Sequence, residues 1–324
     1  MILTLTPNPS VDQTVDLDAA LTRGAVHRLL RSTSQSGGKG VNISRAAVAA
    51  DVPTIALFPA PLDDPYVAEL RAAGIDCRPE ESGAPVRVNI TVTEPDGTTT
   101  KLNSPGSSVT PELLERLGRS LVELAGRAQW LVLAGSLPPD CPEDWYADLV
   151  VAAHRAGARV AVDTSDAPLA ALARRLGEDP AAAPDLMKPN GAELASLTGD
   201  DPDALEADPE RVAQAARRLV ERGVSAVLAT LGPHGAVLVT GEGAWHATPP
   251  AVEVLSTVGA GDSSLFGYLL GEHRGLADPG ERLALAVAYG SAAAALPGTT
   301  IPTPGHTHPE QAQVRRLAPG RLIR

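Results

Sequence analysis

Residues 256–264 read STVGAGDSS and place a carboxylate directly after a glycine turn. Gly259, Ala260 and Gly261 carry at most a methyl group, so their backbone N–H groups can approach a ligand closely. If a helix begins here, these N–H groups and the helix dipole favour an anion. Asp262 would then be placed to take a proton from a hydroxyl group. Taken alone, the stretch is more simply explained as a turn that only begins and caps a helix.

Neither of the common glycine-rich nucleotide motifs fits. GAGDSS has Ser264 where the third small residue of a dinucleotide motif should stand, and the sequence after it is helical, with no second strand. A second stretch, SGGKGVN at 36–42, lacks the first glycine of a P-loop and the hydroxyl that should follow Lys39. A third, KPNGAE at 188–193, spaces Asn190 and Glu193 as a helix capping box would. We therefore expect three turns that begin helices.

Strand and helix patterns alternate along most of the chain. Such an order predicts a mostly parallel sheet covered by helices on both faces, a three-layer αβα fold. In open parallel sheets, ligands bind beyond the carboxyl ends of the strands. The stretches TPNPSVD, AGSLPPD, VDTS, MKPNGAE, TLGPHG and STVGAGD all follow strand patterns, so we expect them at one edge of the sheet.

Two segments break the alternation and have extended character, at about 12–35 and 85–104. The second alternates with a period of two around PDGT, which predicts a hairpin. We expect them to form a small β-sheet lid on a single domain spanning 1–324, and we expect a homodimer through that lid. GAVLVTGEGAWHATP predicts another hairpin at the edge of the main sheet, and the proline-rich tail is expected to be irregular.

The overall composition excludes several classes of protein. The formal net charge of −12 disfavours nucleic acid and acidic membranes as partners. The start MILTLTPNPS has neither a basic segment nor a long apolar run, so we expect a cytoplasmic protein. Cys77 and Cys141 are the only cysteines and imply no disulfide framework. His306 and His308 form an HTH pair in the tail, where a solvated segment is expected rather than a metal site.

Taken together, GGKGVN and STVGAGDS, in this order and spacing, resemble the two signature regions of the ribokinase/PfkB family of carbohydrate kinases. The likeness runs from about residue 6 to about residue 297. Within the family, the stretches VRVNITVTEPDGTTTKLNSPG and MKPNGAEL look most like the bacterial 1-phosphofructokinase group. Tagatose-6-phosphate kinases and the minor 6-phosphofructokinases are similar. The resemblance implies a ribokinase-like fold and an ATP-dependent, Mg²⁺-requiring sugar-phosphate kinase, with fructose 1-phosphate as the favoured acceptor.

The resemblance also implies roles for individual residues. Asp262 would be the catalytic base, with an anion hole formed by Gly259, Ala260 and Gly261. The sugar site would contain Asp12, Gly37, Gly38, Lys39, Asn42, Arg87, Asn89 and Ser136, with Arg87 and Asn89 reaching the sugar phosphate. The nucleotide site would contain Lys188, Asn190, Thr230, Gly232 and Gly235, and Asn190 and Glu193 would hold hydrated Mg²⁺.

Two stretches depart from the family pattern. PAPLDDP at 59–65 replaces a glycine-rich turn near the sugar cleft, and RGAVHR at 23–28 has Ala25 and His27 where relatives acting on fructose 6-phosphate can carry basic residues. The second departure favours fructose 1-phosphate. A non-catalytic sugar-phosphate sensor and a nucleoside kinase are the alternatives. The retained base and metal residues disfavour the first, and the pair Arg87 and Asn89 disfavours the second.

Overall fold

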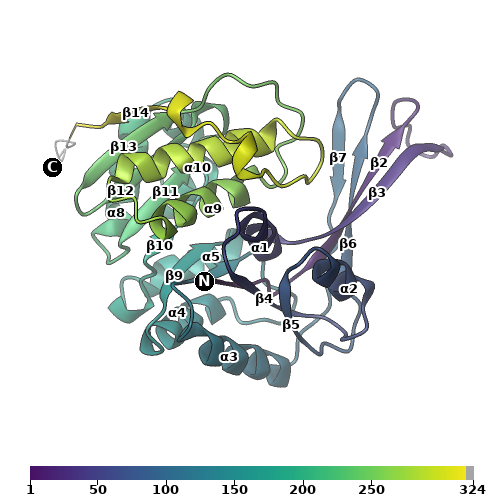
Figure 1. Cartoon of the computed structure of the whole chain (residues 1–324), viewed down its shortest axis with the longest axis horizontal. Coiled ribbons are helices and arrows are strands. Elements are labelled where there is room, and N and C mark those ends of the chain that lie inside the picture. Colours follow the sequence, from purple (N-terminus) through teal and green to yellow (C-terminus); the bar gives the residue numbers. More distant parts are fainter. Residues whose placement is uncertain (319–324) are drawn as a thin grey trace.

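The computed structural model describes residues 1–318 and contains a large sheet with strand order β14-β13-β12-β11-β10-β9-β8-β1-β4-β5 (Figure 1). The part from β5 to β11 is parallel, as the alternation of strands and helices predicts. Its strands are β1 (Ile2–Leu5), β4 (Thr54–Pro59), β5 (Asp76–Glu80), β8 (Trp130–Ala134), β9 (Arg159–Asp163), β10 (Leu186–Met187) and β11 (Ala226–Thr230).

Helices cover both faces of this sheet because alternate strand residues are apolar on each side. One face, which includes Ile2 and Val132, packs against α1 (Lys39–Ala49), α9 (Ala260–His273) and α10 (Pro279–Ala294), and α2 (Pro65–Ala72) covers β4 on the same side. The other face includes Leu3 and Leu131. It packs against α3 (Pro111–Ala125), α4 (Trp145–Arg155), α5 (Asp166–Arg175), α6 (Gly191–Thr198), α7 (Pro202–Glu206) and α8 (Pro209–Val220).

Helices α9 and α10 lie unusually close together because glycines occupy their contact. A Cβ atom on Gly267 would stand 2.6 Å from the carbonyl oxygen of Leu285, and one on Gly290 would overlap Ser264. This close packing fixes the position of α9, whose first turn carries Asp262.

The antiparallel edge of the large sheet contains β12 (Ala236–Thr240), β13 (Gly243–Thr248) and β14 (Gln313–Arg316). The hairpin predicted from GAVLVTGEGAWHATP is confirmed. The expectation of a wholly irregular tail is wrong, because β14 pairs with β13 and covers a strand edge that would otherwise expose unpaired N–H and C=O groups.

A second sheet, here called the lid, has the strand order β3-β2-β6-β7 and stands away from the main body (Figure 1). It consists of β2 (Ser10–Leu17), β3 (Leu29–Gly37), β6 (Arg87–Thr93) and β7 (Thr99–Leu102), the two segments expected to form it. The β2–β6 pair is parallel and the other two pairs are antiparallel. In residues 1–318, no helix is long and apolar enough to span a bilayer.

Candidate active site

Asp262 lies in the first turn of α9, where the glycine turn was expected to hold it. The helix follows Gly259, whose φ of 77° is a left-handed conformation that suits glycine. No side chain caps this end. The first backbone N–H groups of α9 have no intrahelical acceptor, so they remain available to an anion.

The carboxylate of Asp262 is buried, with 6% of the residue exposed, and accepts a hydrogen bond of 2.8 Å from Asn42 Nδ2. Burial raises the pKa of Asp262 to about 6, and the negative charge of Asp163 contributes to the same rise. The hydrogen bond from Asn42 and the positive charge of Lys39 oppose it. The result is a carboxylate that is ionised at neutral pH and more basic than an exposed aspartate, as a general base needs.

Asp163, at the end of β9, connects two of the predicted lysines. Its Oδ1 lies 2.7 Å from Lys39 Nζ and its Oδ2 lies 3.2 Å from Lys188 Nζ. Burial disfavours the carboxylate, but the two ammonium groups outweigh this effect and lower the pKa of Asp163. Burial alone would lower the pKa of Lys39, but the negative charges of Asp163 and Asp262 outweigh this effect and raise it. The stretch VDTS was expected at a strand end, but Asp163 itself was not among the predicted site residues.

Lys188 also lies against the glycine turn. A Cβ atom on Gly261 would stand 3.2 Å from Lys188 Nζ, a tight contact that the lysine side chain would have to relieve by a small shift. Its neighbour Asn190 caps α6 through its side chain, and Glu193 Oε2 accepts a 2.8 Å hydrogen bond from the Asn190 N–H. The capping-box interpretation is therefore confirmed, and one carboxylate oxygen of Glu193 remains for another ligand.

The remaining nucleotide-side residues follow β11. Thr230 forms an isolated parallel bridge with Asn190, which brings these two strand ends together. Gly232 begins a short 3-10 turn, η2 (Gly232–His234). Gly235 has φ 87°, and a Cβ atom there would overlap the carbonyl of Ala247. The structure thus supplies a packing reason for Gly235 that is independent of any ligand.

The predicted sugar residues on the lid form a second group. Asp12 Oδ1 accepts hydrogen bonds of 2.8 Å from Ser10 Oγ and 3.1 Å from Asn89 Nδ2. Burial raises the pKa of Asp12, and these two hydrogen bonds oppose the rise. A Cβ atom on Gly37 would overlap the Asp12 carboxylate, and Gly38 continues directly into α1 with Lys39 at its first position.

Arg87 is less free than the sequence suggests. Its two terminal nitrogens donate to the backbone carbonyls of Ser104 and Asn8, at 2.6 and 3.2 Å. Nε of Arg87 is buried and has no hydrogen-bond partner among the residues that the structure describes. Asn8 was not among the predicted site residues. Its Nδ2 donates at 3.4 Å to Ser136 Oγ, so it links the arginine to the loop after β8. The only feature of the sequence that could have indicated a site role for Asn8 is its place directly after a strand pattern.

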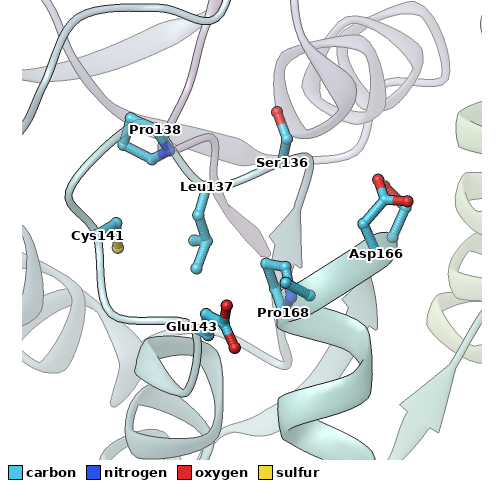
Figure 2. A pocket seen from close by; sticks show the side chains of 9 residues that line it. Ser136, Leu137, Pro138, Cys141, Glu143, Asp166 and Pro168 are labelled. Atoms are coloured by element: carbon cyan, nitrogen blue, oxygen red, sulfur yellow. The ribbon is translucent and has the colours of Figure 1, made fainter.

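A cavity of about 270 Å³ opens beside Ser136, between the loop 136–143 and the start of α5. Figure 2 shows Leu137, Pro168 and Cys141 forming its apolar part, while Glu143 and Asp166 bring carboxylates to its wall. Burial raises the pKa of the Cys141 thiol to about 12, so this thiol is protonated at neutral pH and a poor nucleophile.

The histidine pair of the tail is exposed in the structure. His306 Nδ1 lies 3.1 Å from Thr303 Oγ1, and His308 Nδ1 lies 3.2 Å from Glu310 Oε1. Across residues 1–318, no three His, Cys, Asp or Glu side chains are grouped as a metal site.

The chain is similar to known proteins along nearly its whole length. The family model described as "pfkB family carbohydrate kinase" matches residues 5–304. The chain is 36% identical to a 1-phosphofructokinase of Rhodobacter capsulatus, over 94% of this chain and 93% of that protein. It is 35% identical to a 1-phosphofructokinase of Haloferax volcanii, over 97% and 99% of the two chains.

Among solved structures, phosphofructokinase-2 from Escherichia coli in complex with substrates and products has a similar fold. The TM-score is 0.85 at 30% sequence identity, and the match covers 94% of this chain and 96% of that one.

Proposed function

Because this chain belongs to the PfkB family of carbohydrate kinases and is a sugar-phosphate kinase, we propose that it phosphorylates fructose 1-phosphate with ATP to form fructose 1,6-bisphosphate. The observation that carries the proposal is the position of Asp262. A buried carboxylate, ionised at neutral pH, lies at the uncapped start of a helix and beside the Lys39–Asp163–Lys188 group. The relatives named 1-phosphofructokinase support the choice of acceptor.

In the proposed reaction, Asp262 takes the proton of the sugar 6-hydroxyl as its oxygen bonds to the γ-phosphorus of ATP. The bond from that phosphorus to the β–γ bridging oxygen breaks, and ADP leaves. The N–H groups of Ala260 and Gly261 and the ammonium of Lys188 hold the charge on the transferred group. Phosphoryl transfer depends mainly on such positioning and charge stabilisation. A single donor to developing charge contributes about 3–4 kcal/mol.

The residues at the start of α6 fit Mg²⁺ bound with its nucleotide. Mg²⁺ keeps several waters and needs only one or two protein carboxylates beside phosphate oxygens. Glu193 supplies one, since its second oxygen is not used by the capping box. Lys188, seated against Gly261, would contact the phosphates. When bound, the cation neutralises phosphate charge, and the protein residues hold the nucleotide in place.

The sugar would lie between the lid and α1. Asp12 and Asn89 are hydrogen-bonded on one face of the lid and would bind sugar hydroxyls, with Gly37 leaving room for the Asp12 carboxylate. Arg87 retains a buried, unpartnered Nε–H that can donate to the sugar phosphate.

We also propose that the chain works as a single kinase domain and dimerises through the lid. One lid face is apolar: Val15 and Val92 are buried on it, while Leu29 and Leu102 are 51% and 56% exposed. Exposed apolar surface of this kind is typical of protein interaction sites.

The function is tested by coupled ADP-release assays with fructose 1-phosphate, fructose 6-phosphate, tagatose 6-phosphate and adenosine. We expect the highest kcat/KM with fructose 1-phosphate. In Asp262→Asn, kcat should fall by roughly 10³- to 10⁴-fold, the contribution of a positioned general base, while sugar binding measured by calorimetry is retained.

Asp203→Asn, which alters an exposed carboxylate at the start of α7, is the matched control and should keep full activity. If no sugar phosphate yields ADP, the kinase proposal is wrong. If Asp262→Asn keeps more than a tenth of the activity, Asp262 is not the base.

A further inference from the structure

The chain uses lysine very sparingly. Lysine and arginine together number 27, and only three of these residues are lysines: Lys39, Lys101 and Lys188. Lys39 and Lys188 are both partners of Asp163 in the candidate active site. Lysine provides a compact charge with three donors on a flexible stem, whereas arginine presents a rigid planar fork. A lysine outside the Asp163 group, in a chain that otherwise uses arginine, therefore points to a position where this difference matters.

Lys101 lies on β7 of the lid, on the face that carries the sugar residues. It is directly opposite Thr91 of β6, and Thr91 is opposite Thr14 of β2. Residues opposite one another in neighbouring strands share a face, and every second residue along a strand returns to it. Lys101 therefore shares its face with Asn89 and Asp12, one two-residue step farther along the strands.

The charge of Lys101 acts on the sugar site but is not neutralised within residues 1–318. Its residue is exposed, and it forms no ion pair in that part of the chain. It is one of the groups that oppose the burial-induced rise in the pKa of Asp12. Another cation on this face, Arg31, has the carboxylate of Asp16 directly opposite. Lys101 instead stands opposite Thr91, so no carboxylate faces its charge across this strand pair.

Arg87 by itself is a poor match for a phosphate monoester. Such a group carries a charge of about −1.5 to −2 at neutral pH. Arg87 supplies one positive charge, and both of its terminal nitrogens already donate to backbone carbonyls. Recognition of the phosphate therefore calls for a second cation within reach of the same group.

We propose that Lys101 is that cation: it binds, together with Arg87, the phosphate group that the sugar carries before the reaction, and it makes the enzyme prefer phosphorylated acceptors. This rests on the proposed function, and it adds a substrate-binding residue from β7. Because the flexible ammonium sits at an outer position of the lid, it reaches the phosphate from the side opposite the base of the lid, where Arg87 lies at the start of β6.

Steady-state kinetics of three variants test the role of Lys101. Lys101→Met keeps the length of the side chain and removes its charge, and Lys101→Arg keeps the charge. Arg127→Gln, an exposed cation beyond the end of α3 and far from the lid in sequence, is the matched control. In Lys101→Met we expect KM for the preferred sugar phosphate to rise roughly tenfold, because a hydrogen bond to a charged group at an exposed site contributes about that much to affinity.

The same variant should keep kcat within about twofold, and its KM for ATP should not change. Lys101→Arg should recover most of the sugar affinity, and Arg127→Gln should match the unaltered enzyme. Raising the salt concentration should weaken sugar binding less in Lys101→Met than in the unaltered enzyme, because screening acts on the charge that was removed.

Failure of this inference and failure of the proposed function give different results. An active enzyme in which Lys101→Met changes KM by less than twofold overturns the role of Lys101 alone. Absence of turnover by the unaltered protein overturns the kinase function. In that case calorimetric dissociation constants for fructose 1-phosphate still test the role of Lys101. Equal affinity in the unaltered protein and Lys101→Met, or no binding by either protein, overturns that role.

Discussion

At the scale of single residues, Asp262 combines two opposing requirements. Its position in the first turn of α9 favours a negative charge, while its burial disfavours one, and burial has the larger effect on its pKa. The folded protein therefore binds a proton at Asp262 more tightly than the unfolded chain does. Stability linked to this group is favourable at low pH and declines as the pH rises from about 4 to about 6.

We predict from this that Asp262→Asn stabilises the protein at pH 8. The pKa of about 6 against an ordinary value of 3.8 sets an upper limit of about 3 kcal/mol on the gain. The gain should shrink as the pH is lowered toward 4. Urea unfolding of both proteins at several pH values measures it, with Asp203→Asn as the control. A variant that is less stable than the unaltered protein at pH 8 contradicts the prediction.

The residues of the site were predictable from sequence to different degrees. Asp262, Lys39 and Lys188 stand in recognisable turns, and the structure brings all three to the same group. Asp163 was not predicted, because a lone aspartate at the end of a strand does not reveal that two distant lysines converge on it. The engagement of Arg87 with two carbonyls depends on loop geometry, and this also lies beyond what residue spacing can indicate.

At the scale of elements, the position of the catalytic carboxylate depends on how closely α9 approaches α10. We predict that Gly267→Ala destabilises the protein by about 1–3 kcal/mol, because its Cβ atom would stand 2.6 Å from the Leu285 carbonyl oxygen and force the helices apart. Activity should fall as well, since Asp262 moves with α9. Thermal unfolding and kcat measure the two effects.

Gly118→Ala in α3 is the matched control, because its Cβ atom would make only an ordinary contact of 3.9 Å with Leu149. Alanine is the better helix former, so this variant should be unchanged or more stable by about 0.5–1 kcal/mol. Equal effects of the two substitutions would mean that the α9–α10 contact does not constrain the site.

The start of α6 allows capping and metal binding to be separated. In Glu193→Gln, the amide oxygen can still accept from the Asn190 N–H, so thermal stability should change little. The loss of a carboxylate should raise the Mg²⁺ concentration for half-maximal activity by roughly tenfold. Titration of Mg²⁺ in the ADP-release assay measures this. Glu112→Gln, in the first turn of α3, is the control, and an unchanged Mg²⁺ requirement would leave Glu193 with a capping role only.

The element order was readable from sequence because strand and helix periodicities differ and the helices between the strands mostly span eight residues or more. The strand Gln313–Arg316 was missed for a physical reason: QVRR has little apolar pattern of its own and becomes a strand by pairing with β13. Short edge strands acquire their conformation from a neighbour, which local sequence does not contain.

At the scale of the whole molecule, the lid has an apolar face that is not fully covered, because Leu29 and Leu102 are exposed on it. We predict that light scattering will give twice the chain mass of 33.3 kDa, and that Leu102→Asp will convert the dimer to single chains. Leu62→Asp is the control, since Leu62 is also 56% exposed but lies outside the lid. A monomeric unaltered protein, or a Leu102→Asp variant that remains dimeric, contradicts assembly through this face.

The carboxylate that joins Lys39 to Lys188 has a consequence for the order of events in a turnover. Nucleotide phosphates that pair with Lys188 would leave the negative charge of Asp163 less neutralised. This charge would then act more strongly on Asp262. The proton affinity of the base would therefore increase when nucleotide arrives. By the reciprocity of linked equilibria, a protonated Asp262 would in turn favour nucleotide capture, so substrate loading and proton uptake would be thermodynamically coupled through one buried side chain.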